Sequence, residues 1–216
     1  MLHADGALLV LVKPAGLLAV PGRGEDKQDC LSRRAQAQWP DALVVHRLDM
    51  STSGLVVMAR GMDAQRALSR AFEQRQVHKR YLAVVAGQLV NPLPDNGWST
   101  IDLPLAVDWI NRPRSKVSVD TGKPSLTRWR VAQPAVQTPA THTDIGTRVE
   151  LEPITGRTHQ LRVHLQALGH PILGDALYAN PEQQALATRL LLHAETLELP
   201  HPVTGQMMRF HSPCPF

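Results

Sequence analysis

Short apolar stretches, each ended by a turn that contains proline or glycine, recur along the whole sequence and limit what the chain can fold into. The first stretch, residues 7–12, is followed by Lys13-Pro14-Ala15-Gly16, a turn that ends a strand. Few segments show the longer periodicity of a helix. Many short strands with few helices predict an α+β fold with a mixed, mostly antiparallel sheet.

Residue spacing predicts where the elements lie. Apolar residues recur at helical intervals in the segment 62–76, which predicts an amphipathic helix. In a second helix, 157–168, we expect Leu161 and Leu168 to face the core and Arg162 to lie on a polar face. The segment 133–146 has little periodicity and is expected to be an exposed loop. The other expected elements are a helix at 29–39 with Asp29 as its N-cap, and strands at 55–59, 79–86, 99–103, 116–119, 126–132, 147–151, 190–192, 196–199 and 207–210.

Composition excludes several classes of protein. The 216 residues contain no apolar stretch that could cross a bilayer, and the chain starts without a basic signal-peptide region, so we expect a cytoplasmic protein with no membrane contact. Cys30 and Cys214 are far apart, which indicates neither a disulfide framework nor a zinc site. The net charge of +4 comes from a basic set dominated by arginine. That excess fits either a nucleic-acid surface or a GC-rich genome.

A polar cluster, His46-Arg47-Leu48-Asp49 followed by Ser51-Thr52-Ser53-Gly54, separates two apolar segments. Such polar groups need hydrogen-bond partners or a function. One interpretation is a capped turn in which Asp49 accepts from the amides of residues 51–53. Kinase and serine-hydrolase motifs do not match this spacing. The scattered histidines also lack the spacing of metal ligands, so no metal is expected.

Four motifs in a fixed order resemble those of the RluA family of RNA pseudouridine synthases. The second of them, residues 45–55, resembles the catalytic signature of that family, and together the motifs span nearly the whole chain. A single short motif would be weak evidence, whereas four in order are specific. The other three motifs are Lys13-Pro14-Ala15-Gly16-Leu17, Lys79-Arg80-Tyr81-Leu82-Ala83 with Gly87, and Gly156-Arg157-Thr158-His159-Gln160-Leu161-Arg162-Val163-His164 with residues 169–175.

The resemblance implies a role for each matching residue. Asp49 is expected to be the essential nucleophile or base, Tyr81 to stack on the target uracil, and Arg162 to form an ion pair with Asp49. Leu161 is expected beside the base, and Arg47 is expected to enter the space that the nucleotide leaves. From the residues alone, Tyr81 and Leu161 also suit a core, and Arg162 also suits a phosphate contact. The remaining expected substrate-binding residues are His46, Thr52, Arg157 and His159.

The chemistry of the implied reaction suits a carboxylate. Formation of pseudouridine breaks the N1–C1′ bond and joins C5 to C1′, so the sugar becomes electron-poor, as in glycoside hydrolysis. Asp49 can attack C1′ or remove a proton at C2′, and both routes remain open. No cofactor is required. The target nucleotide must be flipped out of its stack, and water must be excluded from the site.

The resemblance also implies the organisation and partners of the protein. The family's fold has a central active-site cleft, and longer members carry an N-terminal S4 domain. We expect a single catalytic domain, 1–216, made of two sub-lobes that share a sheet, without an S4 domain and acting as a monomer. The segment 102–124 resembles a member with dual specificity for a loop of 23S ribosomal RNA and the anticodon stem-loop of certain tRNAs. Structured RNA, rRNA or a tRNA stem-loop or both, is therefore the expected partner. An RNA chaperone and a free-nucleoside hydrolase are the rival hypotheses.

Overall fold

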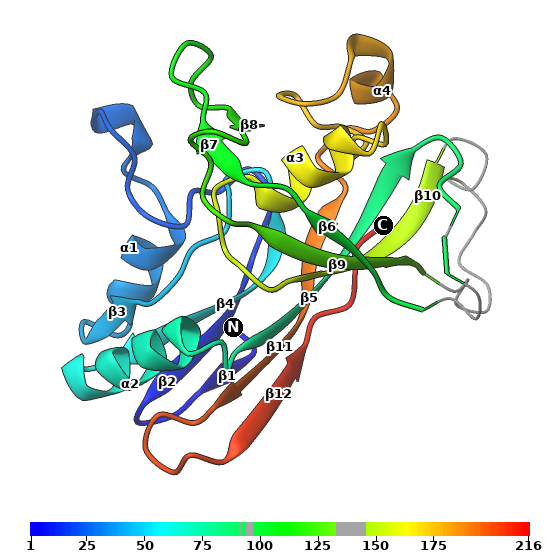
Figure 1. Cartoon of the computed structure of the whole chain (residues 1–216). Helices are drawn as coiled ribbons and strands as arrows, with labels where there is room; N and C mark the ends of the chain where they lie inside the picture. The colour runs from blue at the N-terminus through cyan, green and yellow to red at the C-terminus, as the bar shows by residue number, and fades with distance from the viewer. Residues whose placement is uncertain (91, 94–96, 133–145) are drawn as a thin grey trace. The chain divides into compact units, whose positions relative to one another are not determined.

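The chain forms two compact units in this computed structural model, which describes residues 1–90, 92–93, 97–132 and 146–216 (Figure 1). Unit 1 comprises Met1–Lys79 and His193–Pro215, and unit 2 comprises Arg80–Leu192 and Phe216. The chain leaves unit 1 within strand β5 (His78–Ala86) and returns within strand β11 (Leu192–Pro200).

Strand β4 (Ser53–Arg60) organises the mixed sheet of unit 1. It pairs antiparallel with β2 (Leu8–Lys13) from Gly54 to Ala59. Its start also pairs in parallel with β11, and its end pairs antiparallel with β3 (Ala42–Val44). The loop 45–52, which carries the polar cluster, therefore connects two neighbouring strands. The sheet is extended by β1 (His3–Ala4) on β2 and by β12 (Met207–His211) on β11.

Helix α2 (Met62–Glu73) covers the core of unit 1 (Figure 1). Its apolar stripe buries Leu68 and Ala71 against Val10 and Val57 of the sheet, as the helical spacing predicts. A short 3-10 turn, η1 (Glu25–Lys27), precedes helix α1 (Leu31–Gln36). The helix expected at 29–39 is thus shorter, and its N-cap is Cys30. The predicted cap was wrong because the Asp29 carboxylate instead pairs with Arg34 at 2.6 Å.

Unit 2 contains an antiparallel sheet in the order β5, β10 (Gly146–Pro153), β9 (Leu126–Val131) and β6 (Ser99–Asp102). A separate hairpin consists of β7 (Leu105–Val107) and β8 (Ser115–Val117). Helix α3 (Gln160–Ala167) packs against β8, β9 and β10. Helix α4 (Pro181–Ala185) begins with a capping box at Asn180.

The predicted α+β class is confirmed, with differences at particular elements. The two strands expected at 190–192 and 196–199 form the single strand β11. Helix α3 starts at Gln160 rather than at 157, since His159 has a left-handed backbone with φ 57. Leu168 is 38% exposed and does not belong to the core. Most of the loop predicted at 133–146 lies outside the described residues, and Gly146 already begins β10. Within the described part of the chain, no helix is long and apolar enough to span a membrane.

Candidate functional site

Asp49 lies in unit 1 on the turn that leads into β4. The side chain is partly buried, between the buried Leu48 and the exposed Met50. The backbone closes the turn through a hydrogen bond from the amide of Thr52 to the carbonyl of Asp49 at 3.1 Å. A tight turn limits where the carboxylate can point, because the backbone on both sides of it is fixed.

Lys13 ties the turn of Asp49 to the end of β2. Its side chain is fully buried, and Nζ donates to the carbonyls of Pro14, Leu17 and Met50 at 2.7–2.9 Å. The amide of Gly16 also donates to the carbonyl of Met50 at 2.9 Å. A buried ammonium group needs several acceptors, and these carbonyls provide them. The Lys-Pro-x-Gly motif therefore supports the residue that follows Asp49, a role that the sequence did not reveal.

Strand β11 holds the other end of the loop that carries Asp49, through its pairing with Ser53 and Gly54. Gly54 has φ 115, and a Cβ there would overlap the backbone of Ala194, so only glycine fits at this position. The preceding side chain, Ser53, donates to Nδ1 of His193 at 2.8 Å, and Nε2 of His193 donates to the carbonyl of Ser212 at 3.0 Å. His193 lies 140 residues after Ser53 and outside every motif, so no sequence signal pointed to it.

His46 accepts a hydrogen bond from β4 between the part of β4 that pairs with β11 and the part that pairs with β3. The neighbouring strand is β11 at Gly54 and β3 from Met58 onward, and between them the amide of Val57 donates to Nε2 of His46 at 3.0 Å. The ring also lies 4.8 Å from the ring of Phe72. Burial, together with the nearby charge of Lys79, lowers the pKa of His46 to about 3. The imidazole is therefore neutral at physiological pH and accepts at Nε2.

Tyr81 and Leu161 are buried residues of unit 2. Tyr81 lies on β5 opposite Leu151 of β10 and is 8% exposed, and Leu161 in the first turn of α3 is 7% exposed. Both positions also satisfy the ordinary packing of a core, which is the alternative that the residues alone allowed. Their predicted contacts with a uracil base are not tested by this structure.

Arg162 is buried on α3 rather than placed on a polar surface. Its Nε and Nη2 donate to the two carboxylate oxygens of Asp175 at 2.7 and 2.6 Å, and the Arg162 and Asp175 side chains are 4% and 0% exposed. The amides of Leu177 and Tyr178 donate to the same carboxylate. This bidentate pair fixes the plane of the guanidinium. The predicted pairing of Arg162 with Asp49 joins residues of different units and stays a prediction.

Tyr178 links Arg162 to the start of α3. Its ring lies 5.0 Å from the Arg162 guanidinium carbon, and its hydroxyl accepts from the amide of Ser115 at 2.7 Å. The same hydroxyl is hydrogen-bonded to Nδ1 of His159, also at 2.7 Å. Burial raises the pKa of Tyr178, so the phenol stays protonated. His159 thus has a role in holding its own helix, in addition to the substrate contact predicted for it.

The end of the third motif forms a directed hydrogen-bond chain. Nε2 of Gln160 donates to Oγ1 of Thr127, which donates to Nδ1 of His164, whose Nε2 donates to the carbonyl of Leu103. Burial lowers the pKa of His164, in agreement with a neutral ring in this chain. Such a network fixes α3 on β9, because each buried polar group has a partner. Gln160 and His164 are therefore structural, and the sequence did not distinguish them from their neighbours.

The other predicted residues lie in the same two groups. Arg47 is exposed and Thr52 is buried on the unit 1 loop, while Arg157 is exposed just before α3. The structure thus brings Asp49, His46, Arg47 and Thr52 together in unit 1. In unit 2, Arg157, His159, Leu161 and Arg162 lie at the start of α3, and Tyr81 lies on β5. Asp175 and Tyr178, which hold Arg162 in place, were not predicted as site residues.

The family model for RNA pseudouridylate synthase matches residues 7–167, a range that includes Asp49, Tyr81 and Arg162. The chain belongs to this family and is an enzyme that isomerises uridine to pseudouridine in RNA.

Named relatives and solved structures agree with this assignment. The chain is 49% identical over all 216 residues to the dual-specificity RNA pseudouridine synthase RluA of Escherichia coli (strain K12), covering 93% of that protein. It is 48% identical to the protein of the same name from Yersinia pestis, over 97% of this chain and 96% of that one. Its fold matches human RNA pseudouridylate synthase domain containing 1 with a TM-score of 0.78 and 29% identity, over 100% of this chain and 83% of that one.

Proposed function

We propose that Asp49 is the catalytic carboxylate of this pseudouridine synthase and that its substrates are a loop of 23S ribosomal RNA and a tRNA anticodon stem-loop. The catalytic role of Asp49 is supported by the contacts that hold its loop in one conformation. A buried lysine, a hydrogen-bonded turn and an obligatory glycine hold this one loop. Such a supporting structure suits a group that must meet the reacting sugar in one geometry.

The reaction is balanced without a cofactor. The N1–C1′ bond breaks, the uracil turns, C5 bonds to C1′, and the proton on C5 passes to N1. We propose that Asp49 acts on the electron-poor sugar, either by attack at C1′ or by removal of a proton from C2′. Tyr81 stacks on the uracil, Leu161 packs beside it, and Arg162 supports the ionised carboxylate. The proposed substrate-binding residues are Arg47, His46, Thr52, Arg157 and His159.

The choice of substrates rests on similarity. Relatives at 48–49% identity over nearly their whole length carry the name dual-specificity RNA pseudouridine synthase. We further propose that the two units act as one catalytic domain and that the protein works as a cytoplasmic monomer. Pseudouridine mapping across ribosomal and transfer RNA, in strains with and without the gene, tests the substrates. Loss of a site in only one RNA class would contradict dual specificity.

The test of Asp49 is its replacement by asparagine. Asp49→Asn keeps the shape of the side chain but removes the charge, so pseudouridine formation should fall below detection while RNA affinity stays within a few-fold of wild type. The matched control is Asp63→Asn, because Asp63 on α2 has a fully exposed side chain. Residual turnover by Asp49→Asn comparable to that of the control would refute the proposed role.

Further measurements distinguish the two chemical routes open to Asp49 and test the two rival functions, a free-nucleoside hydrolase and an RNA chaperone. RNA deuterated at C2′ of the target uridine should react several-fold more slowly if Asp49 removes that proton, and at the same rate if Asp49 attacks C1′. A free-nucleoside hydrolase would instead release uracil from uridine, which chromatography detects. An RNA chaperone would keep its activity in Asp49→Asn.

A further inference from the structure

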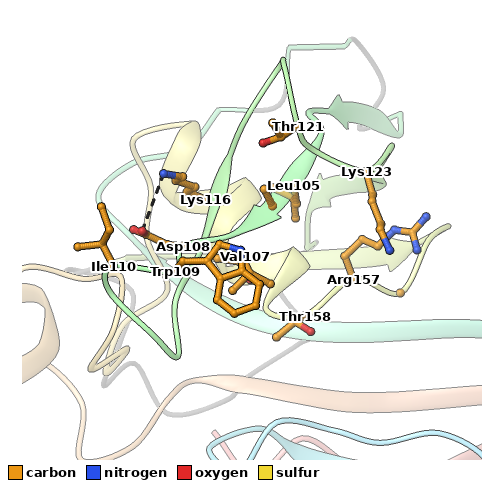
Figure 2. A pocket seen from close by; sticks show the side chains of 13 residues that line it. Leu105, Val107, Asp108, Trp109, Ile110, Lys116, Thr121, Lys123, Arg157 and Thr158 are labelled. Atoms are coloured by element: carbon orange, nitrogen blue, oxygen red, sulfur yellow. Dashed lines mark ion pairs between the residues drawn. The ribbon is translucent and has the colours of Figure 1, made fainter.

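A pocket of about 750 Å³ lies in unit 2 beside the β7–β8 hairpin, and Arg157, one of the proposed substrate-binding residues, lines it (Figure 2). Its volume falls within the roughly 300–1,000 Å³ of typical ligand pockets. The hairpin, the turn before β9 and the segment before α3 provide its walls. The residues that line it include Trp109, Ile110, Lys116, Lys123, Arg157 and Asp108.

The pocket presents an aromatic ring to solvent. Trp109 is 70% exposed and its neighbour Ile110 is 91% exposed, and contiguous exposed apolar surface is what marks an interaction site. The guanidinium carbon of Arg112 lies 3.4 Å from the centre of the Trp109 ring. An indole that carries a cation on one face and remains largely exposed is a platform on which a nucleic-acid base can stack.

Positive charge surrounds this ring. Lys116, Lys123 and Arg157 line the pocket, and Asp108, at 3.8 Å from Nζ of Lys116, is the only carboxylate among the described residues that line it. Nε of Arg157 donates to the carbonyl of Pro124, which brings Arg157 close to the backbone that follows Lys123. In Figure 2 these two cationic side chains lie at one end of the pocket and Ile110 lies at the other. Two neighbouring cations beside a stacking surface fit a phosphate next to a base.

The hairpin is held in place before any ligand arrives. Leu105 and Lys123 exchange both backbone hydrogen bonds, at 3.0 and 2.8 Å. A Cβ on Gly122 would overlap the backbone of Pro104 and Ser118, so this turn packs directly against the hairpin. The amide of Ser115 is bound by Tyr178, the residue that also orders Arg162. A preorganised surface loses less conformational entropy on binding.

We propose that this pocket binds one unpaired nucleotide of the RNA substrate, separate from the uridine that reacts, with its base on Trp109 and its phosphate on Lys123 and Arg157. This inference rests on the proposed function, because it takes the RNA substrate as the ligand and deepens its recognition. An exposed apolar tip alone would also suit a protein partner. The excess of cations over carboxylates in the pocket favours the phosphate backbone.

The stacking part of the proposal is tested with Trp109→Ala. The control is Val119→Ala, because Val119 follows β8 closely in sequence and is 83% exposed but is not among the residues that line the pocket. The probe is an RNA hairpin with an unpaired loop, titrated while tryptophan fluorescence is followed. Trp109→Ala should bind roughly 5- to 100-fold more weakly and lose part of the quenching, whereas Val119→Ala should match wild type. Trp109→Phe should recover much of the affinity.

The proposed phosphate contact of Lys123 is tested by measuring how RNA affinity depends on salt concentration. Lys123→Gln should reduce the slope of log affinity against log salt by about 0.7 to 0.9, the contribution of one phosphate contact. Lys27→Gln, an exposed lysine of unit 1, should leave the slope unchanged. Trp109→Ala should also leave it unchanged, since stacking releases no counterions. A fully paired RNA duplex should bind wild type and Trp109→Ala equally.

RNA binding and uridine isomerisation are measured separately, so the pocket proposal and the proposed function can fail independently. If Trp109→Ala binds the hairpin RNA as well as Val119→Ala does, the pocket proposal is overturned, even where wild type forms pseudouridine normally. If the RNA binds in a Trp109-dependent way but no uridine is isomerised, the pocket stands and the proposed function fails. In active protein, Trp109→Ala should raise KM and leave kcat unchanged. A fall in kcat alone would contradict a pure binding role.

Discussion

The guanidinium of Arg162 is held by Asp175 and Tyr178, which both belong to unit 2. Asp175 accepts two of its N–H groups, and the ring of Tyr178 lies 5.0 Å from its central carbon. Both members of the pair are almost completely buried, which makes the loss of either one costly. Any catalytic work by Arg162 therefore starts from a side chain that the fold has already oriented.

We predict that Arg162→Gln destabilises the protein by about 3 to 5 kcal/mol, because Asp175 would be left as a buried carboxylate without its ion-pair partner. Urea denaturation followed by circular dichroism measures the loss. Arg128→Gln is the control, because its ion pair with Glu152 is partly exposed and should be worth less than about 1 kcal/mol. Equal losses of unfolding free energy for the two variants would show that the buried Arg162–Asp175 pair contributes no more to stability than the partly exposed pair. Activity of Arg162 variants should be compared only at equal folded fraction.

Among the elements, the parallel contact between β4 and β11 fixes the point where the loop of Asp49 leads into β4. Gly54 is required there because its φ is positive and the backbone of Ala194 occupies the space of a Cβ. Gly54→Ala should therefore cost about 3 to 5 kcal/mol, from backbone strain together with the displacement of β11. Gly61→Ala is the control, since Gly61 has φ 77 and ψ 165 but open space around it, and should cost only the backbone strain, about 1 to 3 kcal/mol. Thermal unfolding of both variants measures the two losses of stability. A larger loss for Gly54→Ala would show that the overlap with Ala194 adds to the backbone strain.

The elements that the sequence predicted well are those whose signal is local. Helix α2 and strand β5 have complete periodic patterns, and their bounds agree with the prediction within a few residues. Strand β7 was missed because it has only three residues and depends on pairing with β8. Helix α3 starts late because His159 adopts a left-handed backbone, and nothing in a 3.6-residue period indicates such a conformation.

Across the whole chain, the motifs supplied the proposed site residues but gave no indication of the residues that hold them in place. Lys13, His193 and Asp175 act through contacts with residues 37, 140 and 13 positions away in sequence, respectively. Burial of Arg162 could not be predicted, because its partner comes from a loop beyond the helix. The pocket at Trp109 could not be found from periodicity either, since it combines three separate segments. Long-range partners of this kind follow from the tertiary fold and leave no periodic trace.

Two histidines link the stability of the molecule to pH. Burial lowers the pKa of His46 in unit 1 to about 3 and lowers that of His164 in unit 2. The unfolded chain binds protons at these rings near pH 6.5, whereas the folded chain does not. Stability from each ring is therefore complete above pH 6.5 and is lost as the pH falls below it. The slope can reach about 1.4 kcal/mol per pH unit for each histidine.

We predict that His46→Gln flattens this dependence. Glutamine can still accept from the amide of Val57, but it cannot be protonated. The free energy of unfolding, measured in urea at several values between pH 7.5 and pH 5, should fall less steeply for His46→Gln than for wild type, by up to about 1.4 kcal/mol per pH unit. Leu68→Ala, which removes a buried core side chain and no proton, should lower stability equally at every pH. Parallel curves for wild type and His46→Gln would mean that His46 is protonated as readily in the folded protein as in the unfolded chain, in conflict with its hydrogen bond from Val57.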